Sequence, residues 1–178
     1  MIEDYKKIQE DESAFSRGTP WGDRLEETID KYSCFFRGDL LDIGCNDGRG
    51  MERIQALGHV VTGIDIAEPK IKVAKEHSLN VYLGRIEKLP FKDKEFGTVF
   101  CSHTLEHAED LEKAAAEIER VCGRAIIIVP IEETTENPGH PSPITSIEFL
   151  KELVGGKVIY EQSLIRMEKE HVLIVDYD

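Results

Sequence analysis

The sequence predicts an α/β protein with a doubly wound, mostly parallel sheet of seven strands. Three observations carry this prediction. Short apolar segments alternate with helical ones from residue 40 to residue 130, a glycine-rich turn follows the first of them, and two strand-like segments close the chain. Alternation of strands and helices at this spacing is typical of a parallel sheet whose crossover connections are helices.

Five apolar segments predict the parallel strands, over residues 40–43, 59–65, 79–84, 96–102 and 123–130. The last of them is apolar on both faces, as expected of a central parallel strand. Apolar residues recur at helical spacing between these segments, over residues 51–57, 69–77 and 108–122. We expect one domain, with an N-terminal helical segment at 1–36 that breaks at GTPWG and a core at 37–178.

The end of the chain departs from this alternation. The Thr145-x-x-Glu148 spacing is that of a capping box and predicts a helix over EFLKELV. Residues 157–167 and 170–178 then read as two strands with only a few residues between them. Because so short a connection excludes a crossover helix, the pair is predicted to be an antiparallel hairpin with an antiparallel terminal strand.

Composition limits the classes of function. The 178 residues carry a net charge of −13 with no cluster of Lys and Arg, which disfavours a nucleic-acid partner. No apolar run approaches the 18 or so residues that a membrane span needs, and the charged N-terminus has no signal-peptide core. The four cysteines lack metal-ligand spacing, so we expect a cytoplasmic protein with reduced thiols and no metal site.

The stretch LLDIGCNDGRG, residues 40–50, places a glycine-rich turn at the end of the first strand. In a doubly wound sheet, ligands bind at the carboxyl ends of the strands, where glycines let the backbone approach and the next helix presents free N–H groups. Asp65 ends the second strand, 21 residues after Gly44. It is placed to accept hydrogen bonds from both hydroxyls of a ribose, although an aspartate there can also simply cap a turn.

Two cofactors use this arrangement. A dinucleotide loop reads G-x-G-x-x-G, which G-C-N-D-G-R-G does not match. LLDIGCNDGRG instead resembles motif I of class I S-adenosylmethionine-dependent methyltransferases, written as an acidic residue followed by x-G-x-G-x-G. Asp42, Gly44 and Gly48 match this motif, whereas Asn46 stands where the family has glycine.

The resemblance extends over residues 36–178. VVTGIDIAEPKIKVAKE is similar to the family's second motif, which ends in the ribose-binding acid, and LGRIEKLPF and TLEH resemble its L-P-F and L-E-H stretches. The terminal hairpin corresponds to the family's sixth and seventh strands. The resemblance therefore implies S-adenosylmethionine as the cofactor and a Rossmann-like methyltransferase fold.

The resemblance also implies cofactor-binding residues. The motif I acid and the loop residues are expected at the methionine and ribose, Asp65 at the ribose diol and Ile66 at the adenine. Further contacts are expected after strands three and four. The full set is Asp42, Gly44, Cys45, Asn46, Gly48, Asp65, Ile66, Arg85, Ile86, Cys101 and His103. Arg85 stands where the family often has an acid that accepts from the adenine amino group. A guanidinium has no hydrogen-bond acceptor, so Arg85 cannot replace that acid. Either Arg85 is expected to stack on the adenine ring, or the backbone of Ile86 is expected to recognise the adenine.

Methyl transfer from a sulfonium depends mainly on positioning, and a base is needed only if the acceptor must lose a proton. Three histidines are candidate bases: His103 after strand four, His107 in L-E-H, and His140 in the loop after strand five. His107 also fits a pocket-shaping role, and the loop of His140 fits either an acceptor pocket or a solvated connection. Trp21 is a candidate lid over the cofactor or a plain packing residue.

Three functions remain open. The first is methyl transfer to an O, N or C atom of a small-molecule acceptor, which the acidic charge and the absence of N-P-P-Y or D-P-P-Y favour. The second is methylation of RNA or protein. The third is a non-catalytic partner subunit with a methyltransferase fold. The short chain leaves a modest acceptor pocket, which a second subunit of a homo-oligomer could complete.

Overall fold

The computed structural model describes residues 20–131, 141–165 and 169–178. The chain divides into two compact units, residues 1–85 and residues 86–178. Within the described residues, no helix is both long enough and apolar enough to cross a membrane.

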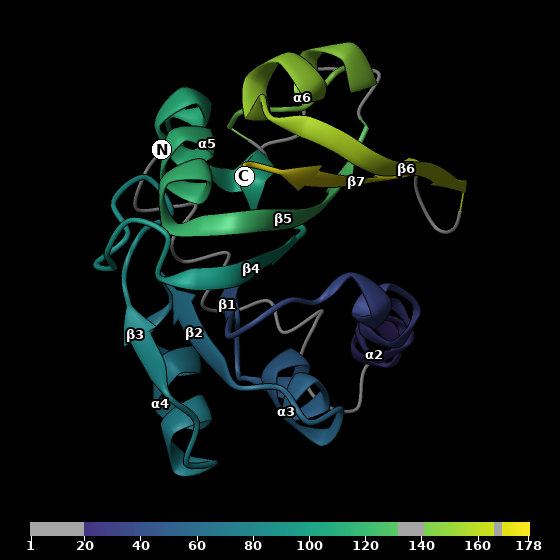
Figure 1. Cartoon of the computed structure of the whole chain (residues 1–178). Coiled ribbons are helices and arrows are strands. Elements are labelled where there is room, and N and C mark those ends of the chain that lie inside the picture. The colour runs from purple at the N-terminus through teal and green to yellow at the C-terminus, as the bar shows by residue number, and fades with distance from the viewer. Residues whose placement is uncertain (1–19, 132–140, 166–168) are drawn as a thin grey trace. The chain divides into compact units, whose positions relative to one another are not determined.

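The first unit contains three parallel strands, β1 (Leu40–Ile43), β2 (Val61–Asp65) and β3 (Val81–Leu83), with β2 in the middle. Helices connect them, as Figure 1 shows: α3 (Arg49–Ala56) between β1 and β2, and α4 (Glu68–Glu76) between β2 and β3. A helix α2 (Pro20–Tyr32) and a short 3-10 helix η1 (Ser33–Phe35) precede β1. All four residues of β1 are buried, which explains its continuous apolar run around Asp42.

The second unit contains β4 (Phe96–Ser102), β5 (Cys122–Pro130), β6 (Lys157–Ile165) and β7 (Lys169–Asp176) (Figure 1). A 3-10 helix η2 (Leu105–His107) and helix α5 (Leu111–Val121) connect β4 to β5, and α6 (Ile147–Val154) precedes β6. β4 and β5 are parallel, whereas β7 pairs antiparallel with both β5 and β6. A buried Arg124 of β5 holds Asp176 of β7 through two contacts of 2.5 and 2.9 Å, which fixes the terminal strand.

The predicted fold class is confirmed. The seven strands follow the order β3-β2-β1-β4-β5-β7-β6, and the described pairings are parallel except those of β7. The closing pair is the predicted antiparallel hairpin. Its last strand inserts between β5 and β6, so β6 forms the edge.

Several predicted boundaries are wrong by a few residues. The second strand begins at Val61 and not at residue 59, and the preceding Val60 has 64 % of its surface exposed. Ala108 was expected on the apolar face of a helix, but it is buried in the turn before α5, which starts at Leu111 behind an Asp110 cap. The predicted capping box is also wrong, because Ser146 caps α6 by accepting from the Phe149 amide at 3.1 Å.

Charged contacts hold α2 against α3. Arg49 contacts Glu26 at 2.8 Å and Asp23 at 2.5 Å, and Arg53 contacts Asp30 at 2.6 Å. Helix α2 thus lies beside the helix that begins at the end of the glycine loop. Trp21 falls within α2, but its side chain lies outside the described part of the structure, so its lid role stays a prediction.

Candidate cofactor and catalytic site

The glycine loop between β1 and α3 has alternating left-handed backbone. Gly44, Asn46 and Gly48 have φ values of 78°, 51° and 83°. These are the three positions that the x-G-x-G-x-G pattern gives to glycine. Asparagine is among the non-glycine residues that best tolerate this conformation, so the loop keeps its shape despite the departure at Asn46.

Asp65, at the end of β2, is tied to this loop. Its Oδ2 accepts from the Asn46 amide at 2.8 Å, and its Oδ1 accepts from the Ala67 amide at 2.8 Å. Burial raises the pKa of the Asp65 carboxyl, and hydrogen bonds from the Ala67, Asn46 and Ile66 amides oppose that rise. A carboxylate can accept about four hydrogen bonds in all, so these three amides leave acceptor capacity for a ligand hydroxyl.

The loop residues also start helix α3. The Asn46 side-chain oxygen accepts from the Asp47 amide at 2.8 Å, and Asp47 Oδ1 accepts from the Arg49 amide at 3.3 Å. Asp47 is buried, with 5 % of its surface exposed. Its carboxylate therefore satisfies a donor that the start of the helix leaves open.

Two glycines are required by close packing. At Gly48, a Cβ atom would overlap the Cδ1 atom of Leu79, and the positive φ disfavours any side chain. At Gly63 of β2, a Cβ atom would lie 2.7 Å from Cys45 Sγ and would overlap Met51 Sδ. The strand, the loop and helix α3 thus meet without space for a methyl group at either position.

Asp42 and Cys45 lie buried beneath the loop, with 6 % and 4 % of their surfaces exposed. Burial, with the nearby Asp65 charge as a second cause, raises the pKa of the Asp42 carboxyl to about 7. Burial also raises the pKa of the Cys45 thiol well above its usual value, so this cysteine is not an activated nucleophile.

The residues expected at the adenine follow β2 and β3. Ile66 and Arg85 are half-buried in the first unit, and Ile86, the first residue of the second unit, is buried. The amide of Gly84 donates to the carbonyl of Asp65 at 2.9 Å, which fixes the chain after β3 beside the end of β2. Contact of these residues with a cofactor stays a prediction.

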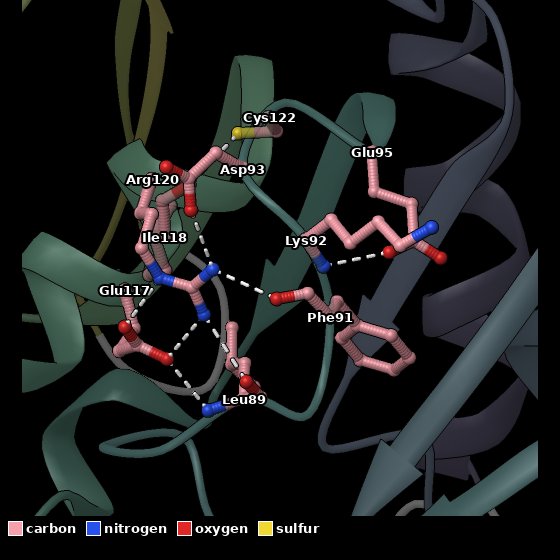
Figure 2. Close-up of polar contacts among 9 residues, drawn as sticks. All are labelled: Leu89, Phe91, Lys92, Asp93, Glu95, Glu117, Ile118, Arg120 and Cys122. Carbon is pink, nitrogen blue, oxygen red and sulfur yellow. Dashed lines mark hydrogen bonds and ion pairs between the residues drawn. The ribbon is translucent and has the colours of Figure 1, made fainter.

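The L-P-F stretch is held by one ion pair on α5, as Figure 2 shows. Arg120 donates to the carbonyls of Phe91 at 2.7 Å and Leu89 at 3.1 Å, and Glu117 accepts from the Leu89 amide at 2.7 Å. Arg120 and Glu117 also contact each other at 2.6 Å, and this bond lowers the pKa of the Glu117 carboxyl. The loop backbone is therefore fixed by side chains that were not predicted as functional.

The end of β4 carries Cys101 and His103. Cys101 is fully buried, and His103 directly follows the strand with φ 51°. The His103 amide donates to the Ile128 carbonyl at 2.8 Å, which continues the β4–β5 pairing. Its ring lies 3.7 Å from Glu106 and 3.7 Å from Glu170, and both carboxylates are buried.

The other two candidate bases are placed differently. His107 is half-buried, and its amide closes η2 by donating to the Thr104 carbonyl at 3.1 Å. His140 lies outside the described residues. His103 has two carboxylate neighbours at ion-pair distance, and the catalytic roles of all three histidines stay predictions.

Sequence reasoning missed three buried polar residues of the second unit: Glu106, Glu170 and His171. Glu106 was visible as the central letter of L-E-H, but nothing in the sequence around β7 marked Glu170 as buried. His171 points away from Glu170 along the strand, and its Nδ1 lies 3.1 Å from Ser163 Oγ.

In the part of the chain that the structure describes, no group of three or more His, Cys, Asp or Glu side chains has the arrangement of a metal site.

Comparison with known proteins agrees with this geometry. Residues 41–126 match a family model described as a methyltransferase domain. The malonyl-[acyl-carrier protein] O-methyltransferase of Erwinia pyrifoliae is 36 % identical over 84 residues, which cover 46 % of this chain and 32 % of that enzyme. The chain spans about a third to two fifths of the length of the curated relatives it matches.

Two solved structures share the fold over nearly the whole chain. A putative methyltransferase of Haloferax volcanii, solved with the Trm112 methyltransferase activator, superposes with a TM-score of 0.79, 15 % identity and 97 % coverage of both chains. A Thermotoga maritima S-adenosylmethionine-dependent methyltransferase, described as a possible histamine N-methyltransferase, has a TM-score of 0.71, 18 % identity and full coverage of both chains.

The fold is that of the class I methyltransferases. Residues 41–126 match the methyltransferase domain model, so the comparisons support the class I S-adenosylmethionine-dependent methyltransferase that the resemblance predicted, with S-adenosylmethionine as the cofactor.

Proposed function

We propose that the protein is an active methyltransferase that transfers the methyl group of S-adenosylmethionine to an O, N or C atom of a small-molecule acceptor. The single observation that supports this most is the link between the glycine loop and Asp65. A loop with three left-handed residues is joined to a half-buried, oriented carboxylate by the Asn46 amide.

The described residues fit the cofactor. The Asp65 carboxylate is oriented by amides on both of its oxygens and keeps acceptor capacity for ribose hydroxyls. Gly44 has no side chain, so the loop backbone at this position can lie close to a ligand. We assign the methionine and ribose to the loop, the adenine to Ile66, Arg85 and Ile86, and the methyl end to Cys101 and His103.

The reaction needs little covalent help from the protein. S-adenosylmethionine supplies an activated methyl group, and the chain supplies binding, orientation and exclusion of water. The small-molecule acceptor is supported by the net charge of −13 and by the O-methyltransferase named among the relatives. Where the acceptor carries a proton on its nucleophilic atom, a base must also be present.

A transfer assay tests this proposal. The full chain is incubated with S-adenosylmethionine labelled in its methyl group and with a cell extract separated by filtration into small molecules and macromolecules. We expect label in the small-molecule fraction, and none with an Asp65→Ala variant. Asp39, which is exposed just before β1, provides the matched control Asp39→Ala, which should transfer normally.

Label in the macromolecular fraction alone would contradict the acceptor class. Nuclease and protease treatment would then distinguish RNA from protein methylation.

A second candidate function is a subunit that acts together with a partner chain. Edge strand β3 exposes two large apolar side chains, with 43 % of Tyr82 and 52 % of Leu83 accessible, and the similar Haloferax volcanii protein was solved with an activator. This candidate predicts that the chain isolated from its native cells carries a second protein, and that label transfer requires it.

A further inference from the structure

Two buried carboxylates and a largely buried histidine meet at the end of β4. His103 Nδ1 lies 3.7 Å from Glu106 Oε1, and His103 Nε2 lies 3.7 Å from Glu170 Oε1. The exposed fractions of the His103, Glu106 and Glu170 side chains are 10 %, 1 % and 4 %. Each nitrogen of the ring therefore faces its own buried carboxylate, and the ring is the most accessible of the three groups.

Three different elements bring these side chains together. His103 directly follows β4, Glu106 belongs to η2, and Glu170 lies on β7 opposite Pro130 of β5. The φ value of 51° at His103 is unusual for a residue other than glycine. Backbone outliers that a fold maintains cluster at functional sites, and here the β4–β5 hydrogen bond from the His103 amide maintains it.

The surroundings make the ring a good proton acceptor. Carboxylates are costly to bury, and a neighbouring cation offsets that cost. A neutral imidazole has one N–H and one lone pair, whereas an imidazolium presents an N–H on both sides. Carboxylates beside both nitrogens thus favour the protonated ring. The distances of 3.7 Å exceed hydrogen-bond length, so both contacts can shorten when the ring becomes charged.

We propose that Glu106 and Glu170 are positioning residues for His103, and that this cluster takes up the proton that a hydroxyl or amine acceptor loses on methylation. The inference rests on the proposed function and narrows its acceptor class. The acceptor oxygen or nitrogen forms a bond to the methyl carbon, and the sulfur–methyl bond breaks with its electron pair passing to sulfur. The acceptor proton passes to a ring nitrogen of His103, and the imidazolium then lies between two carboxylates.

Nuclear magnetic resonance of the full chain with isotopically labelled histidine tests the cluster. The His103 ring signals are those absent from a His103→Gln variant, and their titration is compared in the wild type, Glu106→Gln and Glu170→Gln. We expect the proton affinity of the ring to fall roughly tenfold or more in each variant. Glu170→Asp should recover most of it. Glu112→Gln, at an exposed position on α5, should change nothing.

A titration of His103 that is the same within twofold in both glutamine variants would overturn the proposal. If a variant does not fold, the His103 titration is compared between the native and the urea-unfolded wild type. The native ring should bind a proton at least about tenfold more tightly than the same ring in urea. Equal or weaker binding in the native state would contradict the proposal. Calorimetry with S-adenosylhomocysteine on the same samples separates this result from the proposed function, since loss of cofactor binding would leave the histidine titration unaffected.

Discussion

At the scale of single residues, the conformation of Asn46 explains why a departure from the family motif is tolerated. Its φ of 51° lies in the region that glycine adopts without strain, and its side chain accepts from the Asp47 amide. The sequence could predict that asparagine suits such a position. It could not predict the hydrogen bond from the Asn46 amide to Asp65, because that contact depends on how the loop folds back toward β2.

Replacing Asn46 by glycine should therefore retain or improve cofactor binding. Glycine adopts the same backbone conformation and removes a side chain from the loop, while the amide that holds Asp65 remains. We expect the dissociation constant for S-adenosylhomocysteine to stay the same or fall, as measured by calorimetry. A tenfold weaker complex would mean that the Asn46 side chain itself contacts the ligand.

Gly48→Ala is the contrasting change in the same loop. It combines a positive φ with overlap against Leu79, so we expect a loss of about 2 kcal/mol or more in the free energy of unfolding. Chemical denaturation measures this loss. Gly58→Ala, at a positive φ but with no atom near the added methyl, should cost less, because it adds strain without overlap.

The buried Asp42 predicts a pH-dependent stability. Its pKa is raised to about 7 in the folded protein, above the unfolded value near 4. Burial of the charged carboxyl therefore does not lower the free energy of unfolding below pH 4. The loss of stability grows as the pH rises from 4 to 7 and is constant above pH 7. We expect Asp42→Asn to be more stable than the wild type at pH 8, by on the order of 3 kcal/mol, with the difference vanishing near pH 4.

Thermal or urea unfolding at pH 4, 6 and 8 measures this difference. Asp39→Asn is the matched control, because Asp39 is exposed in the same unit and should show no such trend. A wild type more stable than Asp42→Asn at pH 8 would contradict this expectation and would mean that the surroundings of Asp42 stabilise its charged form.

At the scale of elements, helix α5 anchors the L-P-F loop through Arg120 and Glu117 (Figure 2). Arg120→Met should lower the free energy of unfolding by about 1–3 kcal/mol, since it leaves the Leu89 and Phe91 carbonyls and Glu117 without this donor. Lys113→Met on the same helix removes only an exposed ion pair with Asp110 and should cost far less. Equal losses in urea unfolding would refute the anchoring role.

Helices and strands were predictable from the sequence where apolar residues recurred at a regular spacing or formed a continuous run. β1 and β4 match their predicted residues, because buried parallel strands are continuous apolar runs. Element ends were less predictable, since caps depend on local geometry. Thr145 and Ser146 are both good capping residues, and only the structure shows that Ser146 accepts from the helix.

At the scale of the whole molecule, the order of motifs predicted the fold. The strand order and the inserted β7 confirm the fold class. The histidine cluster was only partly predictable, because Glu170 is 67 positions from His103 in the sequence and meets it through the pairing of β5 with β7. Contacts between distant segments arise from topology, and the sequence pattern of a single strand does not contain them.

The central claim is that the loop and Asp65 bind the adenosyl cofactor, and calorimetric titration with S-adenosylhomocysteine tests it most directly. We expect the wild type and Asp39→Ala to bind alike. Asp65→Ala should bind roughly 100-fold more weakly or not measurably, since it loses two charge-assisted hydrogen bonds of about 1.5–3 kcal/mol each. Absence of binding to the wild type, or equal affinity in Asp65→Ala, would contradict the claim.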